Sequence, residues 1–143
     1  MRKVVGIEEQ IRLDEGEKLH AYKDSLGYMT IGVGRLIDSR KGGGISKEES
    51  AYLLANDIKK VTERLNSALP WAVHLDAVRH GVMVNMGFQL GIGGLLMFTK
   101  TLSFIESGKY SEAANEMLKS QWAKQTPERA ARLALQIKTG VWQ

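Results

Sequence analysis

Residues 13–34 read LDEGEKLHAYKDSLGYMTIGVG, and this stretch decides what kind of fold the chain forms. Its two short runs, LHAYKD and YMTIGVG, have the alternating pattern of strands. The tetrapeptide DSLG between them is typical of a type I turn, with Asp first and Gly last. In the second run, Met29, Ile31 and Val33 share one face, and Thr30 lies on the other, polar face. We therefore expect a small β ribbon near the N-terminus.

Helical patterns lie on both sides of this ribbon. Apolar side chains recur at helical spacing before it and predict a short amphipathic helix over residues 3–14. A glycine would end that helix directly after Glu15. Behind the ribbon, the connector DSRKGGG leads to Ser46 and Glu49, which form a capping box. The apolar stripe that follows predicts a helix over residues 46–67, about 33 Å long.

The rest of the chain reads as helical. The segment LDAVRHGVMVNMGFQL is strongly apolar and predicts a central core helix, which GIGG breaks. Thr99 and Ser111 are candidate N-caps of the next two helices. Thr126 followed by Pro127 predicts the start of a last helix that Gly140 ends.

These elements predict an α+β fold that is mainly α. We expect a β-containing lobe at about 13–45, a linking helix at 46–67 and a helical lobe at 68–143. A chain of 143 residues suits one domain, or two small lobes that share a core. A cleft between the lobes is then the natural place for a site.

Composition narrows the class of protein. Apolar residues make up 43% of the chain and charged residues 25%, which is ordinary for a globular domain. The absence of cysteine excludes disulfides and thiolate metal sites. A net charge of +4 favours anionic partners, although it can also serve solubility alone. The apolar run VVGI is too short for a secretory signal, and GIGGLLMF is too short for a membrane span.

The residue types leave few kinds of catalytic chemistry. His74 and His80 are six residues apart and do not share a helix face, so a zinc site is disfavoured. Phosphate-binding loops and nucleophile motifs are absent from the sequence. Glycoside hydrolysis needs one protonated and one ionised carboxyl group, which Glu15 and Asp24 could supply, and Thr30 could hold a water. The alternative is that these are three unrelated surface residues, since Asp and Gly are common in turns.

The motifs extend this pattern over nearly the whole chain. They are Glu15-x8-Asp24-x5-Thr30, then LDAVR and NMGFQ in the centre, MFTKTL, and finally EAA, QTPERAAR and TGVW. In this order they resemble the phage lysozymes of glycoside hydrolase family 24. The resemblance implies a single lysozyme domain over residues 1–143, with the helix at 3–14 packed on the helical lobe. It implies an endolysin that hydrolyses the β-1,4 bond between N-acetylmuramic acid and N-acetylglucosamine of peptidoglycan.

The resemblance also implies roles for individual residues. Glu15 would be the general acid, and Asp24 and Thr30 would position and activate the attacking water, with inversion at the sugar. The remaining family positions are sugar contacts and structural supports. The implied sugar contacts are Leu36, Phe88, Gln89 and Thr101, and the implied supports are Arg129, Arg35 and Asp57.

Two positions depart from the family pattern. Arg35 stands where the family has His, and we expect it to pair with Asp57 on the long helix. Glu116 replaces a sugar-contact Asn. Arg129 matches a basic residue that pairs with the acid Glu15. The connector before the long helix is also shorter than in the family.

The implied enzyme needs no metal and no cofactor. We expect a monomer that acts on peptidoglycan, binds no nucleic acid and inserts into no membrane. It would accumulate in the host cytoplasm and reach the periplasm and wall after holin-type membrane permeabilisation. Two rivals remain: a lytic transglycosylase, which uses one Glu and releases an anhydro-sugar, and a non-catalytic basic module that binds nucleic acid or wall polymer with a steep salt dependence.

Overall fold

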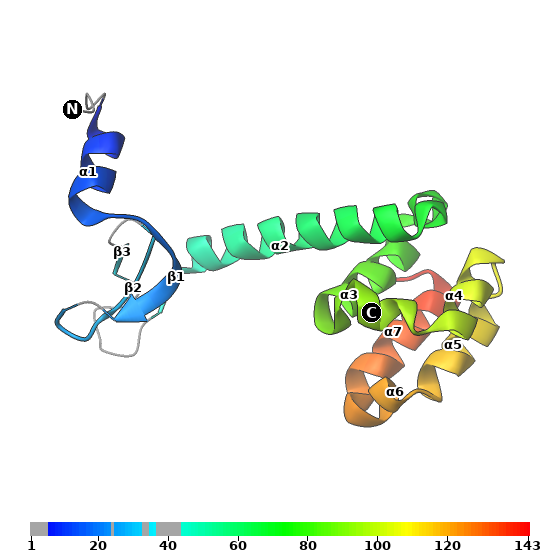
Figure 1. Cartoon of the computed structure of the whole chain (residues 1–143). Helices are drawn as coiled ribbons and strands as arrows, with labels where there is room; N and C mark the ends of the chain where they lie inside the picture. Colours follow the sequence, from blue (N-terminus) through cyan, green and yellow to red (C-terminus); the bar gives the residue numbers. More distant parts are fainter. Residues whose placement is uncertain (1–5, 24, 33–34, 37–43) are drawn as a thin grey trace. The chain divides into compact units, whose positions relative to one another are not determined.

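The computed structural model describes residues 6–23, 25–32, 35–36 and 44–143 (Figure 1). The chain divides into two compact units, Met1–Leu53 and Leu54–Gln143. The first holds the strands and the second is helical.

The first unit begins with a short helix and a small antiparallel sheet. Helix α1 spans Ile7–Glu15, so it ends one residue after the predicted range of 3–14. Gly16 follows with a positive φ of 73°, a conformation that favours glycine and ends the helix. The apolar Ile7 and Ile11 of this helix are exposed. The packing of the predicted helix 3–14 on the helical lobe therefore stays a prediction.

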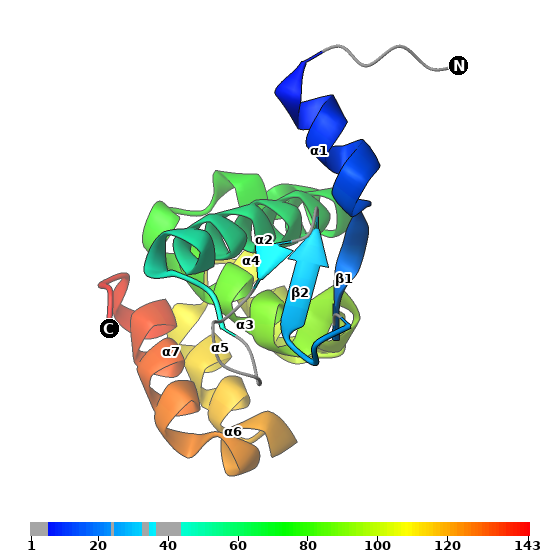
Figure 2. The same cartoon turned by 90° about the vertical axis from the view of Figure 1, so that its left-hand side faces the viewer.

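The sheet has the order β1-β2-β3. Its strands are β1 (Lys18–Lys23), β2 (Met29–Gly32) and β3 (Arg35–Leu36). Figure 2 shows β1 and β2 side by side, and their pairing is irregular between Lys18 and Tyr22, as at a bulge. The predicted ribbon is confirmed, and the structure adds β3 as a third strand.

Helix α2 spans Lys47–Ala68, as the capping box predicts. The Ser46 hydroxyl accepts a hydrogen bond from the Glu49 amide at 3.1 Å. In return, the Glu49 carboxylate accepts one from the Ser46 amide at 2.9 Å. Two amide groups that the helix itself cannot satisfy thus find partners, which fixes where the helix begins.

The second unit continues α2 with a series of shorter helices. They are the 3₁₀ helix η1 (Pro70–His74), α3 (Ala77–Leu96), α4 (Thr99–Glu106), α5 (Tyr110–Leu118), α6 (Gln121–Gln125) and α7 (Pro127–Thr139). Gly91, in the predicted GIGG break, has a φ of 75° and kinks α3. Gly140 ends α7 in the left-handed conformation, as predicted.

Several helix starts differ from the sequence prediction. Thr99 lies inside α4, whose N-cap is Phe98, and Ser111 lies inside α5. Neither helix has a side-chain cap. Thr126 does precede α7, but its hydroxyl donates to the Trp122 carbonyl and caps nothing. Residues such as Thr can bond to a nearby carbonyl instead of an amide, so a sequence pattern does not decide between the two.

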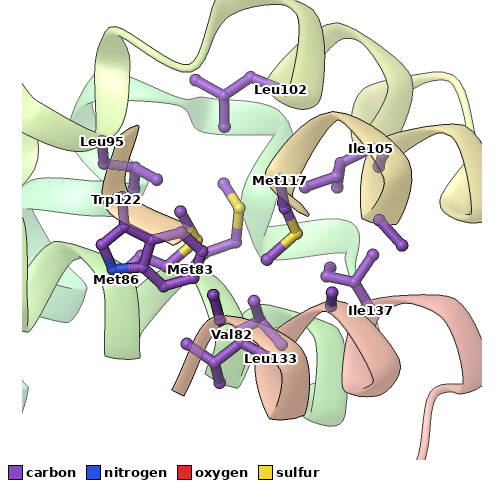
Figure 3. Packing of buried hydrophobic residues seen from close by; sticks show 14 of the residues in the cluster. Val82, Met83, Met86, Leu95, Leu102, Ile105, Met117, Trp122, Leu133 and Ile137 are labelled. Atoms are coloured by element: carbon purple, nitrogen blue, oxygen red, sulfur yellow. The ribbon is translucent and has the colours of Figure 1, made fainter. Parts of the chain in front are cut away.

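The buried apolar side chains among the described residues all belong to the second unit. Figure 3 shows Met83, Met86 and Met117 packed near Trp122 and Leu133. Methionine is flexible and fills irregular gaps between helices that meet at different angles. The predicted core segment is confirmed, since α3 supplies Val82, Met83 and Met86 to this cluster.

The fold class is therefore confirmed as α+β and mainly α, with a small N-terminal sheet. The predicted organisation into one domain stays a prediction. Within the described part of the chain, no single helix is long and apolar enough to cross a membrane. One bent pair, α3 with α4 at 104°, passes the test of length and composition.

Candidate active site

The three predicted catalytic residues belong to the first unit. Glu15 is the last residue of α1, and its side chain lies outside the described structure. Asp24 also lies outside the described residues. Thr30 is described in full: it occupies the central strand of the sheet and pairs with Tyr22 on one side and Leu36 on the other.

Thr30 is buried, which differs from the open polar face that the sequence predicts. Its exposed fraction is 4%, the lowest in its strand. Its hydroxyl donates a hydrogen bond of 3.2 Å to the Tyr28 carbonyl. Alternation along a strand shows which residues share a face, but it does not show what covers that face. Because Thr30 is buried, a substitution at this position is expected to change stability as well as activity.

Leu36 lies directly opposite Thr30 in the antiparallel pair β2–β3. Side chains of directly opposite residues project from the same face of a sheet. The sheet thus brings together one predicted catalytic residue and one predicted sugar contact. Leu36 is exposed, so its side chain is accessible to a ligand.

Arg35 forms an ion pair in the structure, and its partner is Glu49. One guanidinium nitrogen lies 2.8 Å from the carboxylate. The pKa of Glu49 is lowered, chiefly by the hydrogen bonds from Ser46 and further by the positive charge of Arg35. Asp57 lies on α2 in the other unit and is exposed. The expected pairing of Arg35 with Asp57 therefore stays a prediction.

The second unit contains a pocket of about 590 Å³ that we call the Phe88 pocket. Phe88 from α3 and Arg129 from α7 both line it, together with Asn85. The Arg129 guanidinium donates to the Asn85 side-chain oxygen at 2.6 and 3.0 Å. Arg129 is thus held at the lining of this pocket by an uncharged hydrogen-bond partner. Its expected pairing with Glu15 stays a prediction.

A second hollow of about 520 Å³, the Thr101 pocket, lies elsewhere in this unit. Thr101 from α4 lines it and is only 3% exposed. Trp122 from α6 lines it as well, with its ring edge-on to Phe98 at 5.9 Å. The Gln89 side-chain oxygen accepts a hydrogen bond of 2.8 Å from the Trp122 indole. The predicted sugar contact Gln89 therefore positions an aromatic wall of this pocket.

Glu116 also lines the Thr101 pocket, on the side contributed by α5. Its carboxylate lies 3.4 Å from the Lys119 ammonium. The Glu116 side chain is 25% exposed and that of Lys119 is 71% exposed. The departure from the family pattern thus places a partly covered carboxylate on the pocket wall.

Metal binding has no support in the described ranges, where no group of three His, Asp or Glu side chains could hold an ion. Sequence reasoning missed Asn85, Lys119 and the indole bond of Trp122. A lone polar residue in an apolar helix, as Asn85 is in VMVNMGF, is the one signal that could have drawn attention to it.

Known proteins are similar to this chain over most of its length. Residues 13–136 match the family described as phage lysozyme. The probable T4-type lysozyme 1 of Dictyostelium discoideum is 35% identical, over 96% of this chain and 96% of that protein. The endolysin of Salmonella phage P22 is 29% identical, over 83% of each. The pre-baseplate central spike protein Gp5 of Enterobacteria phage T4 is 30% identical over 92% of this chain, which covers 27% of that protein.

Proposed function

The chain belongs to the phage lysozyme family and is therefore a glycoside hydrolase of peptidoglycan, and we propose that it is an inverting muramidase. The bond it cleaves is the β-1,4 link between N-acetylmuramic acid and N-acetylglucosamine. One observation carries the proposal: the order Glu15, Asp24, Thr30 lies inside the matched residues 13–136.

The proposed reaction uses two carboxyl groups in opposite protonation states. Glu15 donates its proton to the leaving glycosidic oxygen. Asp24 accepts a proton from a water that attacks the anomeric carbon from the other face. Inverting enzymes keep their two carboxyl groups about 6.5–9.5 Å apart to make room for this water. The Thr30 hydroxyl gives the water a second contact and so fixes its direction of attack.

Each unit, taken by itself, offers side chains suited to contact a sugar. Leu36 lies opposite Thr30 in the sheet and offers an exposed apolar contact. In the second unit, Phe88 lines its pocket and is exposed, and the largely buried Thr101 lines the other pocket. Sugar rings present both apolar faces and hydroxyl edges, so a mixture of such contacts suits them.

The experiment that tests this function follows the new chain end by NMR on solubilised peptidoglycan. Wild type should release a reducing end whose anomeric configuration is initially inverted. An anhydromuramyl end would show the transglycosylase rival instead. Glu15→Gln should lower the rate by at least about 10²-fold, because Gln cannot donate the proton. If Glu15→Gln keeps more than a tenth of wild-type activity, the assignment of the general acid is wrong.

We further propose that the enzyme lyses the host at the end of infection. The support is that relatives from Salmonella phage P22 and from an aphid endosymbiont phage are named endolysins. The protein would act as a monomer and reach the wall through a holin-type hole. Co-expression with a holin in a Gram-negative host should produce a fall in optical density that expression of either protein alone does not.

A further inference from the structure

One face of the small sheet in the first unit carries a row of three side chains, one from each strand. Tyr22 on β1 and Leu36 on β3 each lie directly opposite Thr30, on either side of it. Directly opposite residues project from the same face, with Cβ atoms about 4.5–5.5 Å apart. Thr30 therefore lies between a tyrosine and a leucine side chain, which fits its exposed fraction of 4%.

Tyr22 is held more firmly than Leu36. Tyr22 is half-buried, and the Lys18 ammonium lies 4.1 Å from the centroid of its ring. The His20 ring meets the Tyr22 ring edge-on, with the two centroids 6.3 Å apart. Leu36, in contrast, is 40% exposed and belongs to a strand of two residues. A cation over a ring and an aromatic neighbour at its edge both restrict how the ring can move.

The hydrogen bond of Thr30 determines what its oxygen can do for a further partner. The hydroxyl donates its proton to the Tyr28 carbonyl at 3.2 Å. A threonine hydroxyl has one donor and two acceptor lone pairs, so in this arrangement its oxygen can only accept. A water bound to it must then donate. Rotation of the Thr30 side chain about χ1 to another staggered position would break the bond to Tyr28 and end this polarity.

We propose that Tyr22, held by Lys18, is a positioning residue that keeps Thr30 in the rotamer bonded to the Tyr28 carbonyl. The Thr30 oxygen then accepts a hydrogen bond from the attacking water, which directs a lone pair of that water toward the anomeric carbon. The inference rests on the proposed function, because it names what holds the residue that orients the water. Tyr22 itself contacts neither the water nor the sugar.

The first test measures the Thr30 rotamer directly and does not depend on activity. In isotopically labelled protein, three-bond couplings from the Thr30 methyl carbon to the backbone nitrogen and carbonyl carbon report the populations of χ1. Wild type should show a single rotamer. Tyr22→Leu should show averaging between rotamers, because leucine leaves room beside Thr30. Tyr22→Phe keeps the ring and should keep the single rotamer.

Tyr52→Leu is the matched control, because it makes the same change in the first unit at a residue of α2 that is 74% exposed. It should leave the Thr30 couplings unchanged. Lys18→Met frees the Tyr22 ring without shortening it and should give averaging intermediate between wild type and Tyr22→Leu. Lys18→Met carries the test if Tyr22→Leu does not fold. Wild-type couplings in either variant would overturn the proposal.

The second test is a double-mutant cycle between Tyr22→Leu and Thr30→Val, measured as turnover of solubilised peptidoglycan. With Thr30 present, Tyr22→Leu should lower kcat roughly tenfold and leave KM unchanged. In Thr30→Val, which has no hydroxyl to position, Tyr22→Leu should lower kcat no further. An equal fall in kcat in both backgrounds would show a general structural role, and a raised KM in both would show a sugar contact. Either result would overturn the proposal.

The rotamer measurement separates this inference from the proposed function. Averaged couplings in wild type would contradict the inference even if the muramidase activity is confirmed. Conversely, a single rotamer that depends on Tyr22, in a protein that cleaves no glycan, would refute the proposed function and leave in place the finding that Tyr22 holds Thr30.

Discussion

Substitutions of Thr30 separate its hydroxyl group from its bulk. Thr30→Ser keeps the hydroxyl and removes the methyl group, Thr30→Val does the reverse, and Thr30→Ala removes both. The residue is 4% exposed and donates a 3.2 Å hydrogen bond to the Tyr28 carbonyl. The two groups can therefore be assigned separate contributions to the free energy of unfolding and to turnover.

The stability effects follow from burial and from the length of the hydrogen bond. At 3.2 Å the bond is long for two oxygens, so we assign it the low end of the usual range, about 0.5 kcal/mol. A buried methyl group contributes about 1 kcal/mol once the cavity it leaves is included. Thr30→Ala should then lose about 1.5 kcal/mol, which lowers Tm by roughly 3–6 °C. Val should lose about 0.5 kcal/mol and Ser about 1 kcal/mol.

The order of Ser and Val should be reversed for activity. If the hydroxyl orients the attacking water, both Val and Ala lose it, and kcat should fall by about 10–100-fold. Ser should retain most of the activity although it is less stable than Val. The assay is the clearing of outer-membrane-permeabilised Gram-negative cells, at a temperature well below the Tm of the least stable variant.

Comparing the activities of Thr30→Ser and Thr30→Val tests whether turnover needs the hydroxyl. Equal activity of Thr30→Ser and Thr30→Val would mean that the hydroxyl by itself does not determine turnover, and that Thr30 is a structural strand residue. An unchanged Tm for Thr30→Ala would contradict the burial argument instead. Binding of intact peptidoglycan should be nearly the same for all four proteins.

Three further outcomes are expected from thermal melts. Gln89→Leu should lose about 1–3 kcal/mol, because the buried Trp122 indole is left without its acceptor, and restoration by Gln89→Glu would support the hydrogen bond over packing. Met117→Ala should lose about 2–5 kcal/mol, whereas Met97→Ala, at 80% exposure, should be close to neutral; equal losses would contradict the described core. The folded-state pKa of Glu49 is lowered below 4.5, so its contribution is present above pH 4.5 and is lost as the pH falls through the folded value. The Tm difference between wild type and Glu49→Gln should shrink over that acidic range, and a difference that stays constant with pH would show that the carboxylate is not stabilised by folding.

The sequence predicted those features that arise from residues close together in the chain, such as helix caps and strand alternation. The capping box of Ser46 and Glu49 fixed the start of α2 because both partners lie within four residues of each other. Strands β1 and β2 were predictable from alternation in the same way, whereas the two-residue strand β3 is too short to show it. The start of α6 was not, although Ser120 caps it by accepting from the Ala123 amide, because the short helix has no periodic stripe to signal it.

The sequence pattern did not predict contacts between residues that are far apart in the chain. Arg129 and Asn85 are 44 residues apart, and only the packing of α7 against α3 brings them together. The sugar contact of Gln89 stays a prediction, and the sequence did not indicate the hydrogen bond that its oxygen accepts from Trp122. The burial of Thr30 belongs to the same class, because it depends on what the fold places over one strand face.

The ion pair between Arg35 and Glu49 also bears on how the chain can change in length. It joins two residues that are 14 apart in sequence, on either side of the connector. Doubling the length of a loop adds only about 0.6 kcal/mol to the entropy of closing it. Evolution can therefore insert or delete connector residues at small thermodynamic cost while both anchoring residues are kept. The same tolerance makes this connector a suitable place to graft a foreign peptide, such as one that directs the enzyme to a different cell wall.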